Sequence, residues 1–165
     1  MSCENVSIRN ATFDDLDEIL ALLSRVNLPS DGVVASVEGF LVARDQTSQL
    51  VATIGLERHG DTGLLRSAAV APEFQGSGVG SLLTRRLLER ARNDGIERVV
   101  LLTTTAKDFF ARRFGFREAA RSMYEEVLGS SSEWNLPRCS SAVCMSVNLR
   151  SDLDQTEKTA AFTKC

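Results

Sequence analysis

The chain has 165 residues, which fits one domain, because a hydrophobic core of this size is seldom closed twice. Hydrophobic residues make up 43% and charged residues 25%, a balance that excludes a disordered or fibrous protein. The 19 basic and 22 acidic residues are well mixed and give a formal net charge of -3, which argues against nucleic-acid binding and favours a small-molecule substrate.

The first ten residues contain no basic segment followed by an apolar run, and no stretch approaches the roughly 20 apolar residues that cross a bilayer. We therefore expect a cytoplasmic protein that binds neither membranes nor nucleic acids. The four cysteines form no CxxC pair, and His59 is the only histidine, so no metal site is predicted.

The first quarter of the chain predicts a strand, a helix and a loop. Val6–Asn10 has the pattern of a short strand, and Thr12 with Asp15 forms a capping box that is typical of a helix start. Apolar residues then recur at helical spacing until Val26, so the helix should have one buried face. Residues 28–36 predict a loop with one helical turn, which could cover a substrate.

The middle of the chain predicts an antiparallel meander followed by a long helix. Three strands are expected between the turn-forming stretches DQTSQ and HGDTG, namely Phe40–Arg44, Leu50–Arg58 and Gly63–Val70. An amphipathic helix should follow from about Gly78 to Asn93, because its leucines recur on one face and its arginines on the other.

The last part of the chain predicts a central strand, a helix and two further strands. Arg98–Thr103 is strongly apolar, and Thr105 with Asp108 predicts a second capping box for a helix that ends near Phe114. The two further strands are Phe116–Arg121 and Ala142–Leu149, with the polar stretch GSSSEWNLPRC between them.

The order of these elements predicts one α+β domain over residues 1–150. Its helices should pack on a mixed, mostly antiparallel sheet in a three-layer α/β/α arrangement. Residues 151–165 have little to bury, so we expect a C-terminal tail that is mobile or loosely docked.

A glycine-rich turn joins the third strand of the meander to the long helix. A helix N-terminus presents unpaired N–H groups and a partial positive charge, and glycines at Gly76, Gly78 and Gly80 would let a diphosphate approach them. The alternative is a tight connection without a ligand. No Lys follows the glycines as in a P-loop, and the preceding meander is not the parallel unit of a Rossmann fold.

This turn resembles the central motif of the Gcn5-related N-acetyltransferases (GNATs), in which Gln or Arg is followed by Gly three residues later and by Gly or Ala five residues later. Gln75, Gly78 and Gly80 match that motif, and the resemblance, with AVAP before it and the FGF of Phe114–Phe116 after it, covers residues 6–150. It implies splayed central strands, acetyl-CoA as co-substrate, direct attack by an amine, and a homodimer.

The resemblance also implies which residues contact the cofactor. The Val70 N–H would act in catalysis as an oxyanion donor to the thioester carbonyl. The tyrosine that many members use as a general acid corresponds to Ala111 here, so the thiol would leave through water, with Tyr124 as the alternative acid. The implied cofactor-binding residues are Ala69, Val70, Gln75, Gly76, Ser77, Gly78, Val79, Gly80, Ser81, Thr104, Phe109 and Phe110.

Within the family, three segments resemble the arsinothricin N-acetyltransferases of arsenic-resistance operons: GLERHGDTGLLRSAAV, TTTAKDFFARRFGF and WNLPRCSSAVCM. This implies acetylation of the α-amine of a glutamate-like amino acid, arsinothricin or its phosphorus counterpart phosphinothricin. Two alternatives stay open. One is another amine, such as a protein N-terminus, a polyamine or glutamate itself, and the other is a catalytically silent acyl-CoA sensor.

A glutamate-like substrate needs cationic partners, and Arg66 interrupts an otherwise apolar strand. We expect Arg66 to bind the substrate, the alternative being an edge arginine in solvent. Glu57 is the candidate catalytic base or ammonium ligand, the alternative being an ion pair with Arg58 or Arg66. The expected substrate-binding residues are Arg66, Ser67, Glu57, Thr103, Asn27 and Leu28.

Overall fold

The structure is a computed structural model that describes residues 5–150 of the chain. Residues 151–165, for which a tail was expected, lie outside the described residues. Within the described range no helix is both long and apolar enough to cross a membrane. Two compact units divide the chain: 5–57 and 65–87 belong to the first, and 58–64 and 88–150 belong to the second.

Seven strands form one sheet in the order β1, β2, β3, β4, β5, β7, β6. The strands are β1 (Ser7–Asn10), β2 (Phe40–Arg44), β3 (Leu50–His59), β4 (Thr62–Val70), β5 (Arg98–Thr103), β6 (Arg117–Glu118) and β7 (Val143–Asn148). Antiparallel pairing joins β1 to β2, β2 to β3, β5 to β7 and β6 to β7.

The helices are α1 (Leu16–Arg25), α2 (Val33–Ser36), α3 (Val79–Asn93), α4 (Lys107–Phe114) and α5 (Glu125–Leu128). Together with the sheet they confirm the predicted α+β fold class. The splay of the central strands stays a prediction. β3, β4 and α3 each run from one unit into the other.

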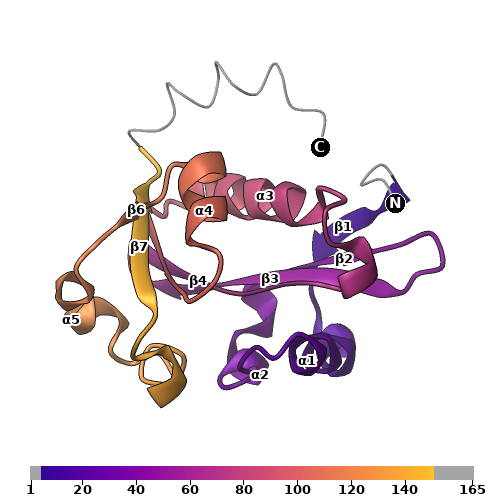
Figure 1. Cartoon of the computed structure of the whole chain (residues 1–165), viewed down its shortest axis with the longest axis horizontal. Helices are drawn as coiled ribbons and strands as arrows, with labels where there is room; N and C mark the ends of the chain where they lie inside the picture. The colour runs from indigo at the N-terminus through magenta and orange to yellow at the C-terminus, as the bar shows by residue number, and fades with distance from the viewer. Residues whose placement is uncertain (1–4, 151–165) are drawn as a thin grey trace. The chain divides into compact units, whose positions relative to one another are not determined.

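In the first unit, helices lie on both faces of the strands. α1 and α2 lie on one side and the start of α3 lies on the other (Figure 1). β3 is buried from Leu50 to Leu56, as expected for a strand that is covered on both faces. α1 buries Ile19, Leu22 and Leu23, which confirms the helical face predicted from the apolar spacing.

A close approach between β2 and β3 explains one glycine of this core. Phe40 is fully buried, and a Cβ placed on Gly55 would lie 2.3 Å from the Phe40 ring. Any side chain at Gly55 would therefore collide with the ring. The glycine lets the aromatic ring lie directly on the neighbouring strand.

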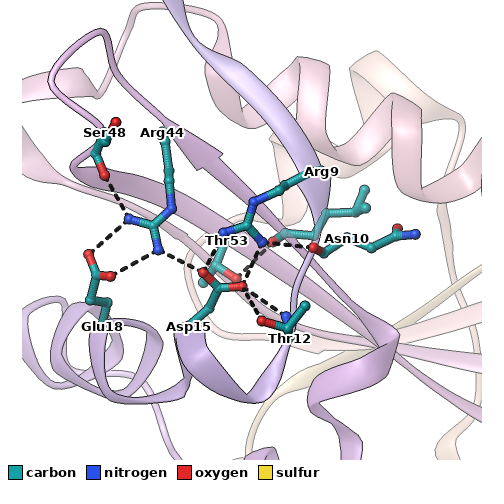
Figure 2. A network of polar contacts seen from close by, with 9 residues as sticks. Arg9, Asn10, Thr12, Asp15, Glu18, Arg44, Ser48 and Thr53 are labelled. Atoms are coloured by element: carbon teal, nitrogen blue, oxygen red, sulfur yellow. Dashed lines mark hydrogen bonds and ion pairs between the residues drawn. The ribbon is translucent and has the colours of Figure 1, made fainter.

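Four charged residues, Arg9, Asp15, Glu18 and Arg44, tie β1 and β2 to the start of α1; we call them the edge cluster (Figure 2). The carboxylate of Asp15 accepts two hydrogen bonds from Arg9 and one from Arg44, each at 2.7 Å. It also accepts the Thr12 N–H at 2.8 Å, so the predicted capping box is confirmed. Arg44 donates further bonds to Glu18 at 2.9 and 3.1 Å.

The electrostatic effect of the edge cluster is greatest at Asp15, whose side chain is only 2% exposed. The hydrogen bonds from Arg9 and then Arg44 hold the pKa of this carboxyl well below its usual range, although burial alone would raise it. The cluster is therefore a saturated structural anchor at the first strand of the sheet.

In the second unit, one apolar cluster packs between the strands and the segment that follows β6. It contains Leu64, Val100, Tyr124, Leu128, Trp134 and Cys144. The sequence predicted only a polar connection around Trp134, yet this side chain is fully buried and its indole N–H donates to Glu125 at 3.0 Å. The short helix α5 was missed because four residues are too few to show helical periodicity.

Two boundary predictions in this unit were wrong. The capping box of Thr105 and Asp108 does not form, because Ala106 stands at the N-cap of α4 and the Thr103 hydroxyl accepts its N–H at 2.9 Å. The strand expected over Phe116–Arg121 shortens to Arg117–Glu118, since the chain then turns into a 3-10 helix at Arg121–Met123.

Candidate functional site

The glycine-rich turn connects β4 to α3 inside the first unit. β4 ends at Val70, and a 3-10 turn at Pro72–Phe74 buries the ring of Phe74. The side-chain amide of Gln75 donates to the Val70 carbonyl at 3.2 Å. The N–H of Ala71 donates to the Val51 carbonyl at 2.8 Å, so the turn starts from a fixed point beside β3.

Two glycines of the turn have backbone conformations that favour glycine. The φ angles of Gly76 and Gly78 are 81° and 92°, in the left-handed region. A Cβ on Gly80 would lie 3.4 Å from a methyl carbon of Val70. The start of α3 therefore lies close to the end of β4, and the space beside Gly76 is open.

The first turn of α3 supplies backbone donors. α3 has 15 residues, and an α-helix leaves its first amides without intrahelical partners. The N–H of Val79 donates to the Ser77 hydroxyl at 3.4 Å, and the N–H of Leu82 donates to the Gly78 carbonyl at 3.0 Å. Amides at the start of a helix and open space beside a glycine suit a pyrophosphate. The residues present therefore fit this part of coenzyme A.

The other cofactor predictions in the first unit fall around this turn. Ala69 is buried, Val70 is half-buried, and Ser81 is buried in the first turn of α3. The Thr84 hydroxyl donates to the Gly80 carbonyl at 2.8 Å, which stabilises that turn. The oxyanion-donor role of the Val70 N–H stays a prediction.

Arg66 and Glu57 form an ion pair between β4 and β3. The distance from Arg66 Nη1 to Glu57 Oε2 is 2.7 Å, and Arg66 Nε donates to the Ser67 hydroxyl at 3.1 Å. The side chain of Arg66 is 0% exposed and that of Glu57 is 12% exposed. Of the alternatives left open by the sequence, the Glu57–Arg66 pair is formed and the solvent-exposed edge arginine is excluded.

Ser67 has an unusual backbone for a strand residue. Its φ is 57°, in the left-handed region that a serine seldom adopts within a strand. Ala68 is exposed and Ala69 is buried after it. The regular alternation of side chains is therefore interrupted at Ser67, and spacing alone cannot place Arg66 on the same face as Val70.

The loop after α1 contains two further predicted substrate residues. Asn27 has a φ of 60°, and the N–H of Leu28 donates to the Leu23 carbonyl at 2.9 Å, which ends the helix. Just before them, Arg25 makes a two-bond contact with Glu73, at 2.7 and 3.1 Å. This contact joins the end of α1 to the 3-10 turn that precedes the glycines. The sequence carried no signal for it, since the partners are 48 residues apart.

The remaining predicted residues belong to the second unit. Phe109 and Phe110 lie in α4 with ring centroids 5.0 Å apart, and Phe110 is buried against Phe116 at 5.5 Å. Thr103 caps the turn into α4, and Thr104 follows it. Their contacts with a cofactor or substrate stay predictions.

The two groups considered for the general acid also lie in this unit. Ala111 lies within α4, as the ungapped match required. Tyr124 is buried in the apolar cluster with Trp134, and the Arg98 guanidinium lies 5.8 Å from the centre of its ring. Its ring therefore has a packing role. Within the described residues, no group of three His, Cys, Asp or Glu side chains is arranged to hold a metal ion.

A family model of the acetyltransferase (GNAT) family matches residues 11–116. An amino-acid acetyltransferase of Ralstonia nicotianae is 32% identical over 123 residues, which are 68% of this chain and 26% of the relative. A second one, of Neisseria meningitidis serogroup A, is 28% identical over 132 residues, 74% of this chain and 30% of the relative. The chain thus spans less than a third of the length of these relatives.

Solved structures show the same fold. Rv2747 from Mycobacterium tuberculosis, in complex with CoA, is 25% identical with a TM-score of 0.71 and covers 86% of this chain and 98% of its own. N-acetylglutamate synthase from Neisseria gonorrhoeae, complexed with coenzyme A and N-acetyl-glutamate, is 23% identical with a TM-score of 0.72, over 87% of this chain and 35% of its own.

Proposed function

Because the chain belongs to the acetyltransferase (GNAT) family, we propose that it transfers the acetyl group of acetyl-CoA to the α-amine of an amino acid. The glycine-rich turn carries this proposal. It has left-handed glycines, open space beside Gly76 and the start of a 15-residue helix, which together suit a pyrophosphate. The amino-acid acetyltransferase that is 32% identical to this chain supports an amino acid as the acceptor.

Each residue of the turn has a defined part in this proposal. Main-chain amides between Gln75 and Ser81 would hold the pyrophosphate, and the backbone of Ala69 and Val70 would align the arm of the cofactor. Bound acetyl-CoA supplies an activated acetyl group. The Val70 N–H would donate to the carbonyl oxygen as negative charge develops on it.

The acceptor amine must lose a proton before it attacks. Glu57 is the member of the Glu57–Arg66 pair whose side chain is partly exposed, and its carboxylate would accept that proton directly or through a water molecule. Ala111 has no group that could protonate the departing thiolate, so water would supply that proton. Holding the amine next to the thioester would contribute most of the rate enhancement.

We further propose that the acceptor is glutamate-like, with arsinothricin as the preferred substrate and phosphinothricin as a second one. The resemblance of three segments to arsinothricin N-acetyltransferases supports this proposal. Two of these segments include the ends of β3 and β4 and the turn into α4. The homodimer and the cytoplasmic location stay predictions, and light scattering of the purified protein would test the first.

One assay separates this proposal from its alternatives. Thiol release from acetyl-CoA would be measured with arsinothricin, phosphinothricin, glutamate, spermidine and a peptide with a free N-terminus. We expect the highest kcat/KM for arsinothricin. Position 111 is an alanine, where many family members have the catalytic tyrosine. This missing tyrosine is the reason to test for a sensor. Acetyl-CoA binding without turnover of any amine would indicate that sensor, and no binding would refute the whole proposal.

The pyrophosphate role of the turn can be tested separately from substrate choice. Gly78→Ala should cost about 1 kcal/mol of stability, because alanine is strained at a φ of 92°. It should also weaken coenzyme A binding by at least tenfold, roughly 1.4 kcal/mol, since the amides would shift. Isothermal titration calorimetry measures the affinity and urea denaturation measures the stability.

Gly95→Ala is the matched control, because Gly95 has a φ of 85° beyond the other end of the same helix. We expect a similar loss of stability and an unchanged affinity for coenzyme A. Equal affinities of the two variants would show that the turn does not hold the cofactor.

A further inference from the structure

The Glu57–Arg66 pair has an uneven exposure that suggests how its two members divide their work. Glu57 retains 12% of its side-chain surface, whereas Arg66 retains none. Part of the Glu57 side chain is accessible to a solute as the structure stands, whereas the guanidinium of Arg66 is accessible only if neighbouring groups move. The sequence had suggested the reverse arrangement, with Arg66 in contact with the substrate.

We propose that Arg66 is a positioning residue, which holds the Glu57 carboxylate so that Glu57, and not Arg66, meets the amine of the substrate. This inference rests on the proposed acetyl transfer. It explains why an arginine is buried in β4, and it places Glu57 nearer to the surface than Arg66.

Arg66 is itself held at two points of its planar group. Its Nη1 donates to Glu57 at 2.7 Å, and its Nε donates to the hydroxyl of Ser67 at 3.1 Å. Because the guanidinium is planar, two fixed donors define its plane. Ser67 has a left-handed φ of 57°, so its backbone geometry is specific to this point of β4. The arginine therefore offers a rigid support.

A rigid support changes what a flexible carboxylate can do. A free glutamate side chain loses rotational freedom about several bonds when it takes up a reactive geometry, and that loss of entropy opposes catalysis. A short, charge-assisted hydrogen bond from Arg66 fixes one carboxylate oxygen of Glu57 in advance. Catalytic groups work best when such neighbours already hold them in place.

Direct binding of a substrate acid by Arg66 would need a different arrangement. The acid would have to replace Glu57 at the guanidinium, or Arg66 would have to leave its buried site. Separating a buried pair is costly, because one charge is left without its partner. This contrast allows an experiment to distinguish the two roles.

The experiment compares an acidic acceptor with a neutral one of the same shape. Wild type, Arg66→Met, Arg66→Lys and Glu57→Gln would be assayed with glutamate and glutamine, and kcat and KM would be measured for each. Activity would be expressed per mole of folded protein, with circular dichroism to measure folding. Arg86→Met, an exposed change on α3, is the control for removal of an arginine and should match wild type.

If Arg66 positions Glu57, Arg66→Met lowers kcat at least tenfold with both acceptors and changes each KM less than threefold. Arg66→Lys should restore part of kcat, since lysine can still pair with Glu57. The double variant Arg66→Met with Glu57→Gln should be no slower than Glu57→Gln alone, because residues that act as one unit are not additive.

A KM increase confined to glutamate, with kcat unchanged, would overturn the inference and assign Arg66 to the substrate acid. Multiplicative losses in the double variant would overturn it as well. If Arg66→Met does not fold, Arg66→Lys replaces it, alone and combined with Glu57→Gln. The same two results, a KM increase confined to glutamate or multiplicative losses, would then overturn the inference. Wild-type turnover decides the proposed function first, so failure of that proposal is distinguished from failure of this inference.

Discussion

Two of the arginine–carboxylate groups in the first unit, the edge cluster and the Glu57–Arg66 pair, differ in how far their carboxylate side chains are exposed. In the edge cluster, Asp15 accepts bonds from Arg9, Arg44 and the Thr12 N–H, and its side chain is 2% exposed. In the other group, Glu57 is held by Arg66 and remains partly exposed. The first arrangement buries the carboxylate side chain, whereas the second leaves it partly exposed to solvent.

The difference shows that an ion pair alone does not identify a working site. A carboxylate whose oxygens are all taken by donors can anchor elements but cannot receive a substrate proton. A carboxylate residue that is held by a buried arginine and whose side chain remains partly exposed can do so. Which member of the pair is exposed is therefore more informative than the distance between the two.

The largest effect on this comparison is expected from Asp15→Ala. Removing the carboxylate leaves Arg9 and Arg44 without their shared partner, so the free energy of unfolding should fall by about 3 kcal/mol. Urea denaturation measures the change. Asp14→Ala, at the exposed neighbour in the same 3-10 turn, is the control and should be nearly neutral. If the Asp15 variant has a reduced kcat at a temperature at which it is folded, the edge cluster is not a purely structural anchor.

The pH dependence of stability should follow the edge cluster. The Arg9 and Arg44 hydrogen bonds depress the pKa of Asp15 in the folded state, so the stabilisation is present above its unfolded pKa of about 3.9 and is lost as the pH falls further. Urea midpoints measured from pH 6 to pH 2 should decrease in wild type. Asp15→Asn should start lower and show a flatter decrease. Parallel profiles of the two proteins would mean that other carboxyl groups determine the pH dependence of stability.

Glu18→Gln should have a smaller effect, because the Glu18 side chain is 49% exposed. We expect a loss of about 0.2–1 kcal/mol, as for other surface ion pairs. Repeating the thermal melt at 1 M salt should reduce the difference from wild type, since salt screens exposed charges. A loss as large as that of Asp15→Ala would show that the cluster acts as a unit with no central member.

The smallest effect is expected from Arg25→Gln and Glu73→Gln, whose side chains are 50% and 39% exposed. Because both side chains of the pair are exposed, neither melting temperature should differ measurably from that of wild type. Calorimetric melts at low salt give the most sensitive measurement. A clear decrease in both variants, and recovery in the charge-reversed double variant, would place this contact among the structural anchors.

Much of the fold could be predicted from the sequence where turn residues and apolar periods agree. The bounds of β2 and β5 were predicted to the residue, because polar turns border a continuous apolar run. The region around Trp134 was not predicted, since its helical pieces are short and its stability comes from tertiary packing.

The candidate site was predictable only in part. The glycine-rich turn was recognised because its residues are adjacent in the chain. The Glu57–Arg66 pair was foreseen as one alternative, but the burial of Arg66 was not, because burial depends on neighbours that are distant in sequence. Likewise, Asp15 was assigned to a helix cap, and its contacts with Arg9 and Arg44 came only from the folded strands.

The buried indole of Trp134 gives the protein a built-in optical reporter. It is the only tryptophan of the chain, it is fully buried in the second unit, and the Arg121 guanidinium lies 4.6 Å from the centre of its ring. Its emission therefore reports on the second unit alone, whereas circular dichroism averages over both units. Coincident transitions by the two signals would mean that the units melt as one cooperative body, and a separation would give the fluorescence midpoint of the second unit by itself.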